Sequence, residues 1–169
     1  WNDPPAPQSQ PIYLLSPEQT GEASAQKQKR LQDKMKELNI DALILTKLDE
    51  IAWLTNLRGN DIAYNPVFEA YGIIFQDHAL CFCQVDVSQT IQEQLPGFQF
   101  LPYAEYPSYL ERLKNDPERK KVWLDPSSTT IGTYLSLGEK LSKEGFSEKI
   151  YNQDHPLILW KACKNPVEI

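Results

Sequence analysis

Apolar residues along this chain fall into short blocks whose spacing predicts both helices and strands. Leu31, Met35 and Leu38 lie four and three positions apart among Lys, Gln and Asp residues, so residues 22–38 are predicted to form an amphipathic helix. The block 42–46 is an apolar run that ends in Thr, and it is predicted to be a buried strand. The patterned part of the chain therefore begins with a helix that leads into a strand.

The later blocks continue this alternation. The predicted helices cover residues 48–54, 87–95, 106–113 and 131–141. The predicted strands cover residues 70–75, 79–84, 98–101, 121–125 and 146–151, and a further short apolar segment lies at 157–160. Helices separate most of the strands, and the polar turn at 76–78 predicts a hairpin. The expected fold class is therefore α/β, with a mixed β-sheet flanked by helices on both faces.

The N-terminal segment is richer in proline than the rest of the chain. Residues 1–20 contain five prolines and are predicted to be an extended, Pro-rich interdomain linker that lies along the domain surface. Residues 21–164 then form one domain, which is a common size for a single hydrophobic core.

The final residues, 165–169, read as the start of a helix. Asn165 is a candidate N-cap, Pro166 follows at the first helical position, and Glu168 completes a capping box. We expect this segment to be the truncated start of a further domain. It is also expected to be poorly ordered or only weakly helical, because a single turn bears the cost of nucleation without further turns to offset it.

Composition narrows the class of protein. The formal net charge is -6 and the sequence pI is about 5.0, and no basic cluster is present that could neutralise a run of phosphates, which argues against nucleic acid as a partner. No apolar stretch is long enough to cross a membrane. Cys81, Cys83 and Cys163 lack metal-type spacing and are predicted to be reduced thiols of a cytoplasmic protein.

The acidic residues and the two histidines are the candidate metal ligands or catalytic groups. Asp41, Asp86 and Asp125 lie at strand ends, as the carboxylates of a two-metal nuclease would, but Asp86 and Asp125 also precede helices, where acids act as caps. His78 and His155 have no second ligand at helical spacing, so each is predicted to be solvated or singly hydrogen-bonded. We therefore expect no cofactor or metal to be bound by this chain.

The polar cluster between residues 56 and 61 is the candidate site. Gly59 is expected to allow a positive φ, and a turn is predicted there. In one interpretation Arg58 pairs with Asp61, or with a helix C-terminus, and orders the loop. In the other, Asn56, Arg58 and Asp61 contact substrate or a neighbouring domain, where a guanidinium binds a carboxylate or carbonyl. Three nearby aromatic residues are predicted to pack in the core or between domains rather than to form a ligand cage: Tyr64, Phe68 and Tyr71.

This cluster belongs to a longer motif that resembles a known family. The segments that carry the resemblance are Trp1-Asn2-Asp3-Pro4, Thr20-Gly21 with Lys27, Asp49-Glu50-Ile51-Ala52-Trp53-Leu54, Asn56-Leu57-Arg58-Gly59 with Asp61, Asn65-Pro66-Val67-Phe68, and Lys161 to Ile169. Together they resemble the middle domain of cytosolic three-domain Xaa-Pro aminopeptidases of the creatinase/prolidase superfamily. One position departs from the family pattern, because Pro4 stands where an Arg is usual.

The resemblance implies a fold, an activity and partners. It implies the creatinase/prolidase N-terminal type of domain, a ribonuclease H-like scaffold without its acids. The parent enzyme would remove the N-terminal residue that precedes proline, using two divalent metals, usually manganese, held by a catalytic domain that is absent here. This chain alone would then be inactive and would provide a scaffold or restrict access to the cleft.

The partners implied are the chain's own first and catalytic domains, a second copy in a homodimer, and a peptide with proline at its second position. Two alternatives stay open. One is an autonomous binding or dimerisation module that shares the fold, and the other is a fragment of a prolidase- or creatinase-like hydrolase.

Overall fold

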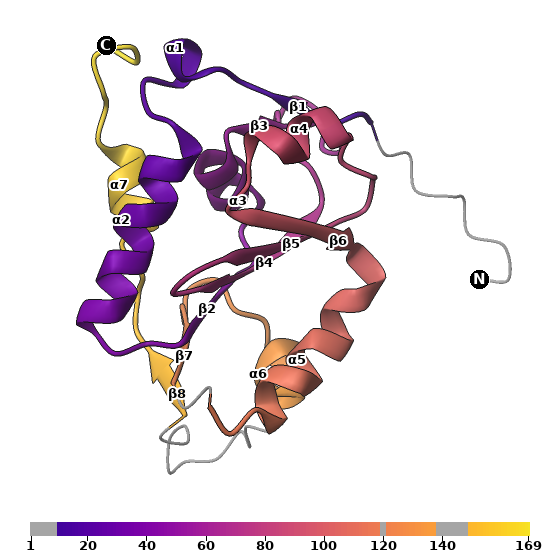
Figure 1. Cartoon of the computed structure of the whole chain (residues 1–169), viewed down its shortest axis with the longest axis vertical. Coiled ribbons are helices and arrows are strands. Elements are labelled where there is room, and N and C mark those ends of the chain that lie inside the picture. The colour runs from indigo at the N-terminus through magenta and orange to yellow at the C-terminus, as the bar shows by residue number, and fades with distance from the viewer. Residues whose placement is uncertain (1–9, 119–120, 138–148) are drawn as a thin grey trace, which may run out of the picture.

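A six-stranded mixed β-sheet forms the centre of the molecule (Figure 1). The structure is a computed structural model that describes residues 10–118, 121–137 and 149–169. In spatial order the strands are β6 (Phe98–Pro102), β5 (Ala79–Cys83), β4 (Ala70–Phe75), β2 (Ala42–Leu45), β7 (Val122–Leu124) and β8 (Ile150–Asn152). Strand β4 is antiparallel to both of its neighbours, and the other adjacent pairs are parallel. The carboxyl ends of the five other strands therefore share one edge with the start of β4.

Helices cover both faces of this sheet (Figure 1). On one face lie α2 (Ser24–Glu37), α3 (Leu48–Thr55) and α7 (Leu157–Ala162), whose buried residues share one core. On the other face lie α5 (Tyr106–Asn115) and α6 (Ile131–Ser136), which contribute to a second core. The short helix α4 (Gln89–Gln94) connects β5 to β6. The predicted fold class, a mixed sheet flanked by helices, is confirmed.

Strand β2 shows why an uninterrupted apolar run predicts a central strand. Leu43 and Leu45 are buried in the core beneath α2 and α3, whereas Ala42 and Ile44 are buried in the core beneath α5 and α6. Successive side chains of a strand point to opposite faces, so a strand covered on both sides needs apolar residues at every position.

The segment before α2 contains more structure than its prolines suggest. Strand β1 (Tyr13–Leu14) pairs antiparallel with β3 (Leu57–Arg58), and α1 (Pro17–Thr20) follows. Ile12 is buried in the first core. The extended conformation predicted for this segment is therefore found in β1 but not in α1. Local signals for α1 are present, because Pro17 stands at the first helical position and Gly21 ends the helix at φ 73°.

Two predicted elements near the C-terminus extend beyond the described residues. The predicted helix at 131–141 appears as α6 and the predicted strand at 146–151 as β8, while residues 138–148 lie outside the part described. The apolar segment at 157–160 is helical and belongs to α7. Within the described ranges, no helix is both long enough and apolar enough to span a membrane.

Candidate functional site

The turn between α3 and β3 contains a buried polar side chain at its centre. Asn56 ends α3 in the left-handed conformation, with φ 60° and ψ 11°, which Asn tolerates better than most residues. Its amide nitrogen donates to the hydroxyl of Thr20 at 3.1 Å and to the carbonyl of Glu22 at 2.9 Å. Its side-chain oxygen accepts a hydrogen bond from Lys27 Nζ at 2.6 Å. Asn56 is only 2% exposed, so it joins three segments inside the domain.

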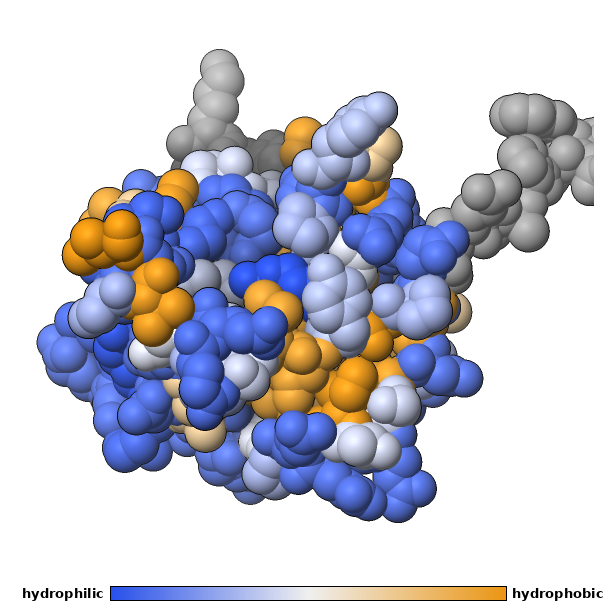
Figure 2. Space-filling view, turned by 90° about the horizontal axis from the view of Figure 1, so that it is seen from above, coloured by the Kyte–Doolittle hydropathy of each residue, from blue (hydrophilic) through white to orange (hydrophobic). Residues whose placement is uncertain are grey.

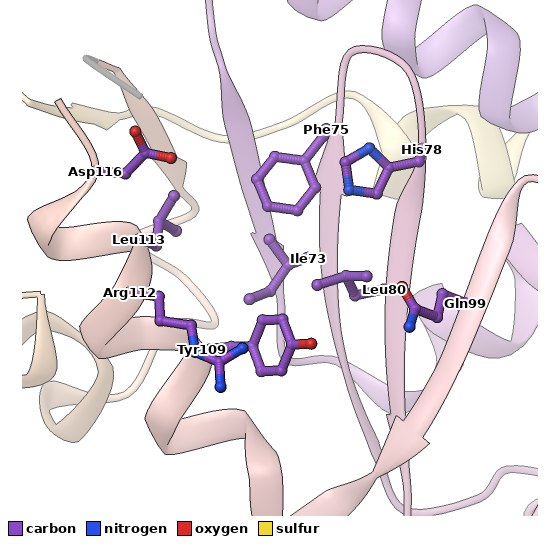
Figure 3. A pocket seen from close by; sticks show the side chains of 9 residues that line it. All are labelled: Ile73, Phe75, His78, Leu80, Gln99, Tyr109, Arg112, Leu113 and Asp116. Carbon is purple, nitrogen blue, oxygen red and sulfur yellow. The ribbon is translucent and has the colours of Figure 1, made fainter. Parts of the chain in front are cut away.

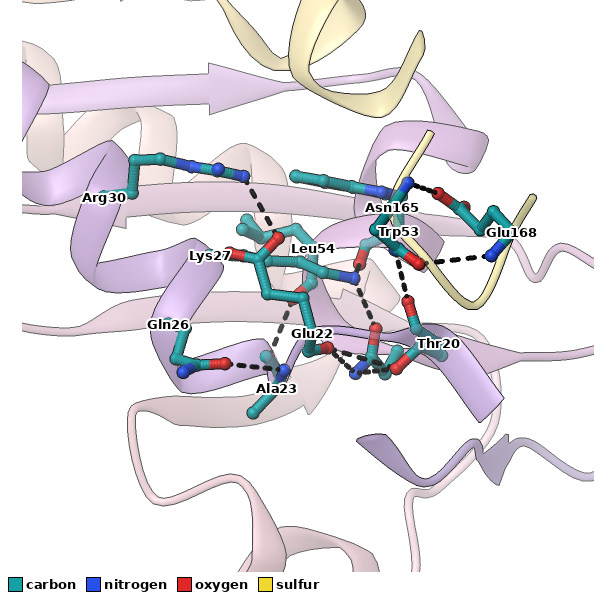
Figure 4. A network of polar contacts seen from close by, with 12 residues as sticks. Thr20, Glu22, Ala23, Gln26, Lys27, Arg30, Trp53, Leu54, Asn165 and Glu168 are labelled. Carbon is teal, nitrogen blue, oxygen red and sulfur yellow. Dashed lines mark hydrogen bonds and ion pairs between the residues drawn. The ribbon is translucent and has the colours of Figure 1, made fainter. Parts of the chain in front are cut away.

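Lys27 is the buried cation of this network (Figure 4). Its ammonium donates to the carbonyl of Trp53 at 2.8 Å and lies 4.4 Å from the centre of the Trp53 ring. Burial lowers the pKa of Lys27 to about 8, and the nearby Glu22 carboxylate opposes that shift. A buried ammonium held by neutral oxygens and an aromatic face is costly to charge.

The C-terminal residues pack against the same region (Figure 4). The backbone N–H groups of Val167 and Glu168 donate to Asn165 Oδ1 at 3.0 and 3.2 Å, and Asn165 N–H donates to Glu168 Oε2 at 3.0 Å. The capping box predicted from the sequence is therefore formed around a single turn. Asn165 Nδ2 also donates to the carbonyl of Thr20 at 2.9 Å, and a side chain at Gly21 would collide with Asn165. The turn is thus attached to the α1–α2 connection.

Arg58 stabilises the end of α3. Its Nη1 donates to the carbonyls of Ala52 at 2.7 Å and Leu57 at 2.8 Å, and burial lowers the pKa of the guanidinium. Arg58 was predicted to pair either with Asp61 or with a helix C-terminus, and the structure shows the contact with the helix C-terminus. Asp61 forms hydrogen bonds with other residues. A further contact of Arg58 with another domain stays a prediction.

Asp61 closes the base of the loop that follows β3. Its carboxylate accepts hydrogen bonds from the backbone N–H groups of Gln10 at 3.1 Å and Glu69 at 2.8 Å. Gly59 does not have the positive φ expected for it. Instead, a Cβ at position 59 would lie 2.7 Å from the Cβ of Phe68, so close packing explains the glycine. The loop is held at its base by backbone and side-chain contacts together.

The tip of this loop presents Tyr64 to solvent. Ile62 and Asn65 form an isolated antiparallel bridge, and Tyr64 between them has φ 63° and a fully exposed side chain. A non-glycine residue in this conformation costs about 1 kcal/mol. Of the three aromatic residues Tyr64, Phe68 and Tyr71, Phe68 is in the core, and Tyr71 is half-buried.

Figure 2, viewed from the end of the molecule with α1, β1 and β3, shows apolar side chains gathered within a largely hydrophilic surface.

His155 differs most from its prediction. It is neither solvated nor singly bonded, because its Nε2 lies 3.2 Å from Glu50 Oε2 and 3.5 Å from Asp125 Oδ2, with all three side chains buried. Asp125 also accepts hydrogen bonds from the backbone and hydroxyl of Ser127 at 2.7 and 2.6 Å, which supports its structural role. His78 pairs with Asp77 at 2.7 Å near the surface.

The acids do not converge as a nuclease would require. Asp41 precedes β2 and its carboxylate accepts a hydrogen bond from Lys121 N–H, whereas Asp125 follows β7, at the opposite edge of the sheet. Within residues 10–118, 121–137 and 149–169, no group of three or more His, Cys, Asp or Glu side chains could hold a metal ion.

A small cavity of about 230 Å³ lies between the sheet and α5 (Figure 3). Ile73, Phe75 and Leu80 supply apolar surface, and Arg112 and His78 bring ionisable groups to it. Arg112 also lies 4.6 Å from the centre of the Tyr109 ring. This cavity combines apolar and charged lining, and it is separate from the turn at Asn56.

Comparison with known proteins assigns the class. Residues 3–168 match the model of the Creatinase/Prolidase N-terminal domain family, and the chain belongs to that family. It is 36% identical over 160 residues to Xaa-Pro aminopeptidase 1 of Dictyostelium discoideum, covering 94% of this chain and 24% of that protein. It is 34% identical over 175 residues to Xaa-Pro aminopeptidase ApepP of Drosophila melanogaster, covering 100% of this chain and 27% of the relative.

A solved structure is similar over nearly the whole chain. The X-prolyl aminopeptidase of Caenorhabditis elegans, described as a cytosolic enzyme with a di-nuclear active site, superposes with a TM-score of 0.81 at 25% identity. The match covers 99% of this chain and 27% of that one. The chain thus spans about a quarter of the length of these relatives.

Proposed function

We propose that this chain is a non-catalytic domain of a metal-dependent Xaa-Pro aminopeptidase, an enzyme that removes the N-terminal residue preceding proline. The observation that carries the proposal is identity of 34–36% to two Xaa-Pro aminopeptidases over 94–100% of the chain. The chemistry would belong to a separate catalytic domain with two divalent metals, manganese being the expected ion.

The described residues do not suit such a metal pair. Three ionisable side chains meet in the core, with His155 Nε2 3.2 Å from Glu50 and 3.5 Å from Asp125. Lys47 Nζ also lies 3.7 Å from Glu50, so the carboxylates face these two side chains rather than a shared metal site. We therefore assign no catalytic step to this chain.

The proposed role of the domain is to support and partly enclose the cleft of the enzyme, in a cytoplasmic homodimer. The loop closed by Asp61 is the candidate contact with a neighbouring domain or subunit. It holds Tyr64 fully exposed in a left-handed conformation, and an apolar ring displayed from a closed loop is available for burial by a partner. Asn56 and Arg58 would support this loop from beneath, and Arg58 could add a polar contact.

The experiment compares this chain with the full-length protein on a peptide with proline at position two, with manganese added. We expect turnover only by the full-length protein. Turnover by this chain alone would exclude a non-catalytic role, and the absence of Xaa-Pro cleavage by the full-length protein would refute the parent activity.

A second arm tests the loop. Tyr64→Gly removes the ring and suits the left-handed backbone, so we expect unchanged or slightly higher stability of this chain. In the full-length protein we expect kcat/KM or dimer affinity to fall at least tenfold. The control is Leu159→Ala, because Leu159 is also exposed but lies on α7, and it should leave kcat/KM and dimer affinity unchanged. Unchanged kcat/KM and assembly for Tyr64→Gly would show that the loop contacts neither partner.

A further inference from the structure

A tyrosine-lined cavity lies where the parallel strands of the sheet end. Its volume is about 330 Å³, and its wall comes from the start of β4, the 3₁₀ turn η1 (Tyr103–Glu105), the first turn of α5 and one side of α6. η1 directly follows β6, and α6 follows β7. In open α/β sheets, ligand sites form beyond the carboxyl ends of the strands. The cavity has the size and the position of such a site.

Three tyrosine rings form one side of the cavity. The Tyr71 ring stacks on Tyr106 with centroids 4.0 Å apart and planes at 8°, and it packs against Tyr103 at 5.0 Å and 30°. The lining also includes Thr130, Gly132 and Thr133, from α6 and its N-cap, which bring hydroxyl groups but little bulk. The cavity therefore combines packed aromatic rings with small polar side chains.

One hydrogen-bond donor in this wall is not used. The Tyr106 hydroxyl is buried and has no hydrogen-bond partner among the described residues, and Tyr106 itself is only 5% exposed. Thr133 lies near the Tyr106 hydroxyl and opposes the rise of its pKa, and the Thr133 hydroxyl also contacts that of Thr130 at 3.2 Å. Burial raises the pKa of both Tyr106 and Tyr103 well above the usual value. Both hydroxyls thus stay neutral donors near neutral pH.

The ligand that fits has an apolar ring and acceptor oxygens but no charge. Among the described residues, no charged side chain lines the cavity, in contrast to the cavity of Figure 3, where Arg112, His78 and Asp116 contribute. A prolyl peptide bond provides a carbonyl acceptor without an N–H donor. Proline-rich segments are also pre-ordered in an extended helix that docks in aromatic-lined grooves.

We propose that the Tyr71–Tyr103–Tyr106 cavity binds a neutral, proline-containing peptide segment, with the Tyr106 hydroxyl donating to a peptide carbonyl. The choice of peptide rests on the proposed function, because proline peptides are the substrates expected there. The site would hold a part of the peptide distant from the scissile bond, since the proposed function assigns no catalytic step to this chain.

The test measures binding to this chain alone, by ¹⁵N chemical-shift titration. The probe is acetyl-Ala-Pro-Pro-Ala-Pro-amide, and the control peptide has Ala at each Pro. We expect saturable shifts at Tyr71, Tyr103 and Thr133 with the proline peptide and at least tenfold weaker binding of the control. Equal affinity for the two peptides, or no shifts at these residues, would overturn the proposal.

Two variants and a matched control assign the site. Tyr106→Phe removes only the unused hydroxyl, and Gly132→Leu fills the cavity, where a Cβ meets nothing closer than Thr130 Oγ1 at 3.7 Å. Both should bind the proline peptide at least tenfold more weakly while melting within a few degrees of the parent. Tyr109→Phe, in the cavity of Figure 3, removes an equivalent hydroxyl and should bind normally. Unchanged binding by both Tyr106→Phe and Gly132→Leu would place the peptide elsewhere and refute this site.

Peptide binding by this chain and Xaa-Pro cleavage by the full-length protein can fail independently of each other. If the full-length protein cleaves Xaa-Pro peptides but this chain does not bind the probe, only the tyrosine cavity is refuted. If the chain binds the probe through Tyr106 but the full-length protein does not cleave, the parent activity is refuted and the binding site stands.

Discussion

The side-chain oxygen of Asn56 accepts a hydrogen bond of 2.6 Å from the ammonium of Lys27, and both residues are at least 98% buried. This contact joins α2 to the end of α3, 29 positions apart. Since Asn56 also binds Thr20 and Glu22, its side chain holds the α1–α2 connection in place as well.

Asn56→Ala should therefore destabilise this chain by about 2–4 kcal/mol, because it leaves buried partners unsatisfied and places Ala in a left-handed conformation. Urea unfolding of Asn56→Ala, Lys27→Met and the double variant would measure the coupling, expected to exceed about 1 kcal/mol. Additive effects would mean that the Lys27–Asn56 bond contributes little.

The lowered pKa of Lys27 should be visible in the pH dependence of the free energy of unfolding. Its pKa is about 8 in the folded chain, below the usual lysine value of 10.5, so the unfolded chain binds the proton more tightly. The contribution of Lys27 to the free energy of unfolding should therefore rise as the pH increases from about 8 to 10. Between pH 7 and 9.5, the free energy of unfolding of the parent relative to Lys27→Met should increase by about 2 kcal/mol. Lys29→Met, at an exposed position on α2, is the control and should show no such trend.

His155 should be essential for stability although it has no assigned catalytic role. His155→Leu leaves Glu50 and Asp125 facing each other in the core, and we expect a loss of about 3–5 kcal/mol in the free energy of unfolding. His78→Gln, at a half-exposed position, should change stability by less than about 0.5 kcal/mol. Adding Glu50→Leu to His155→Leu should recover part of the loss, since it removes one of the two facing carboxyl groups. Equal, small effects at both histidines would show that the contacts of His155 with the two acids contribute little to stability.

Arg58 and Asp61 should act independently in this chain. Arg58→Ala removes the contacts with the carbonyls of Ala52 and Leu57, and should cost about 1–2 kcal/mol of stability. Asp61→Ala releases the backbone of Gln10 and Glu69, with a cost of similar size. A double-mutant cycle should give a coupling below about 0.5 kcal/mol. Strong coupling would mean that the two side chains pair in solution.

The fold could be predicted in outline because its signals are local. The spacing of Leu31, Met35 and Leu38 predicts α2, and the apolar runs on either side of 76–78 predict the β4–β5 hairpin, both of which the structure confirms. Residues 57–58 gave no such signal. They form a strand only because β1 lies beside them, and a two-residue strand has too few positions to show periodicity.

The candidate site could be predicted only in part. The motif around Asn56 and Arg58 pointed to the correct turn, and the chemistry of Asn suits its left-handed conformation. The motif did not predict the hydrogen-bond partners of Asn56. Those partners, Lys27 and Thr20, are distant from Asn56 in the sequence and are brought to it by packing. The contact of His155 with Glu50 likewise spans most of the chain.

By itself, the sequence determined the strands of the mixed sheet, most of the helices and the family, since each depends on periodicity, turn residues or a contiguous motif. The tertiary structure alone decided which polar groups are buried together. Asn165 and Thr20 lie 145 positions apart, and no local pattern encodes that distance. A buried polar side chain must be paired when water is excluded, but only the packing of helices on the sheet determines which partner is within reach.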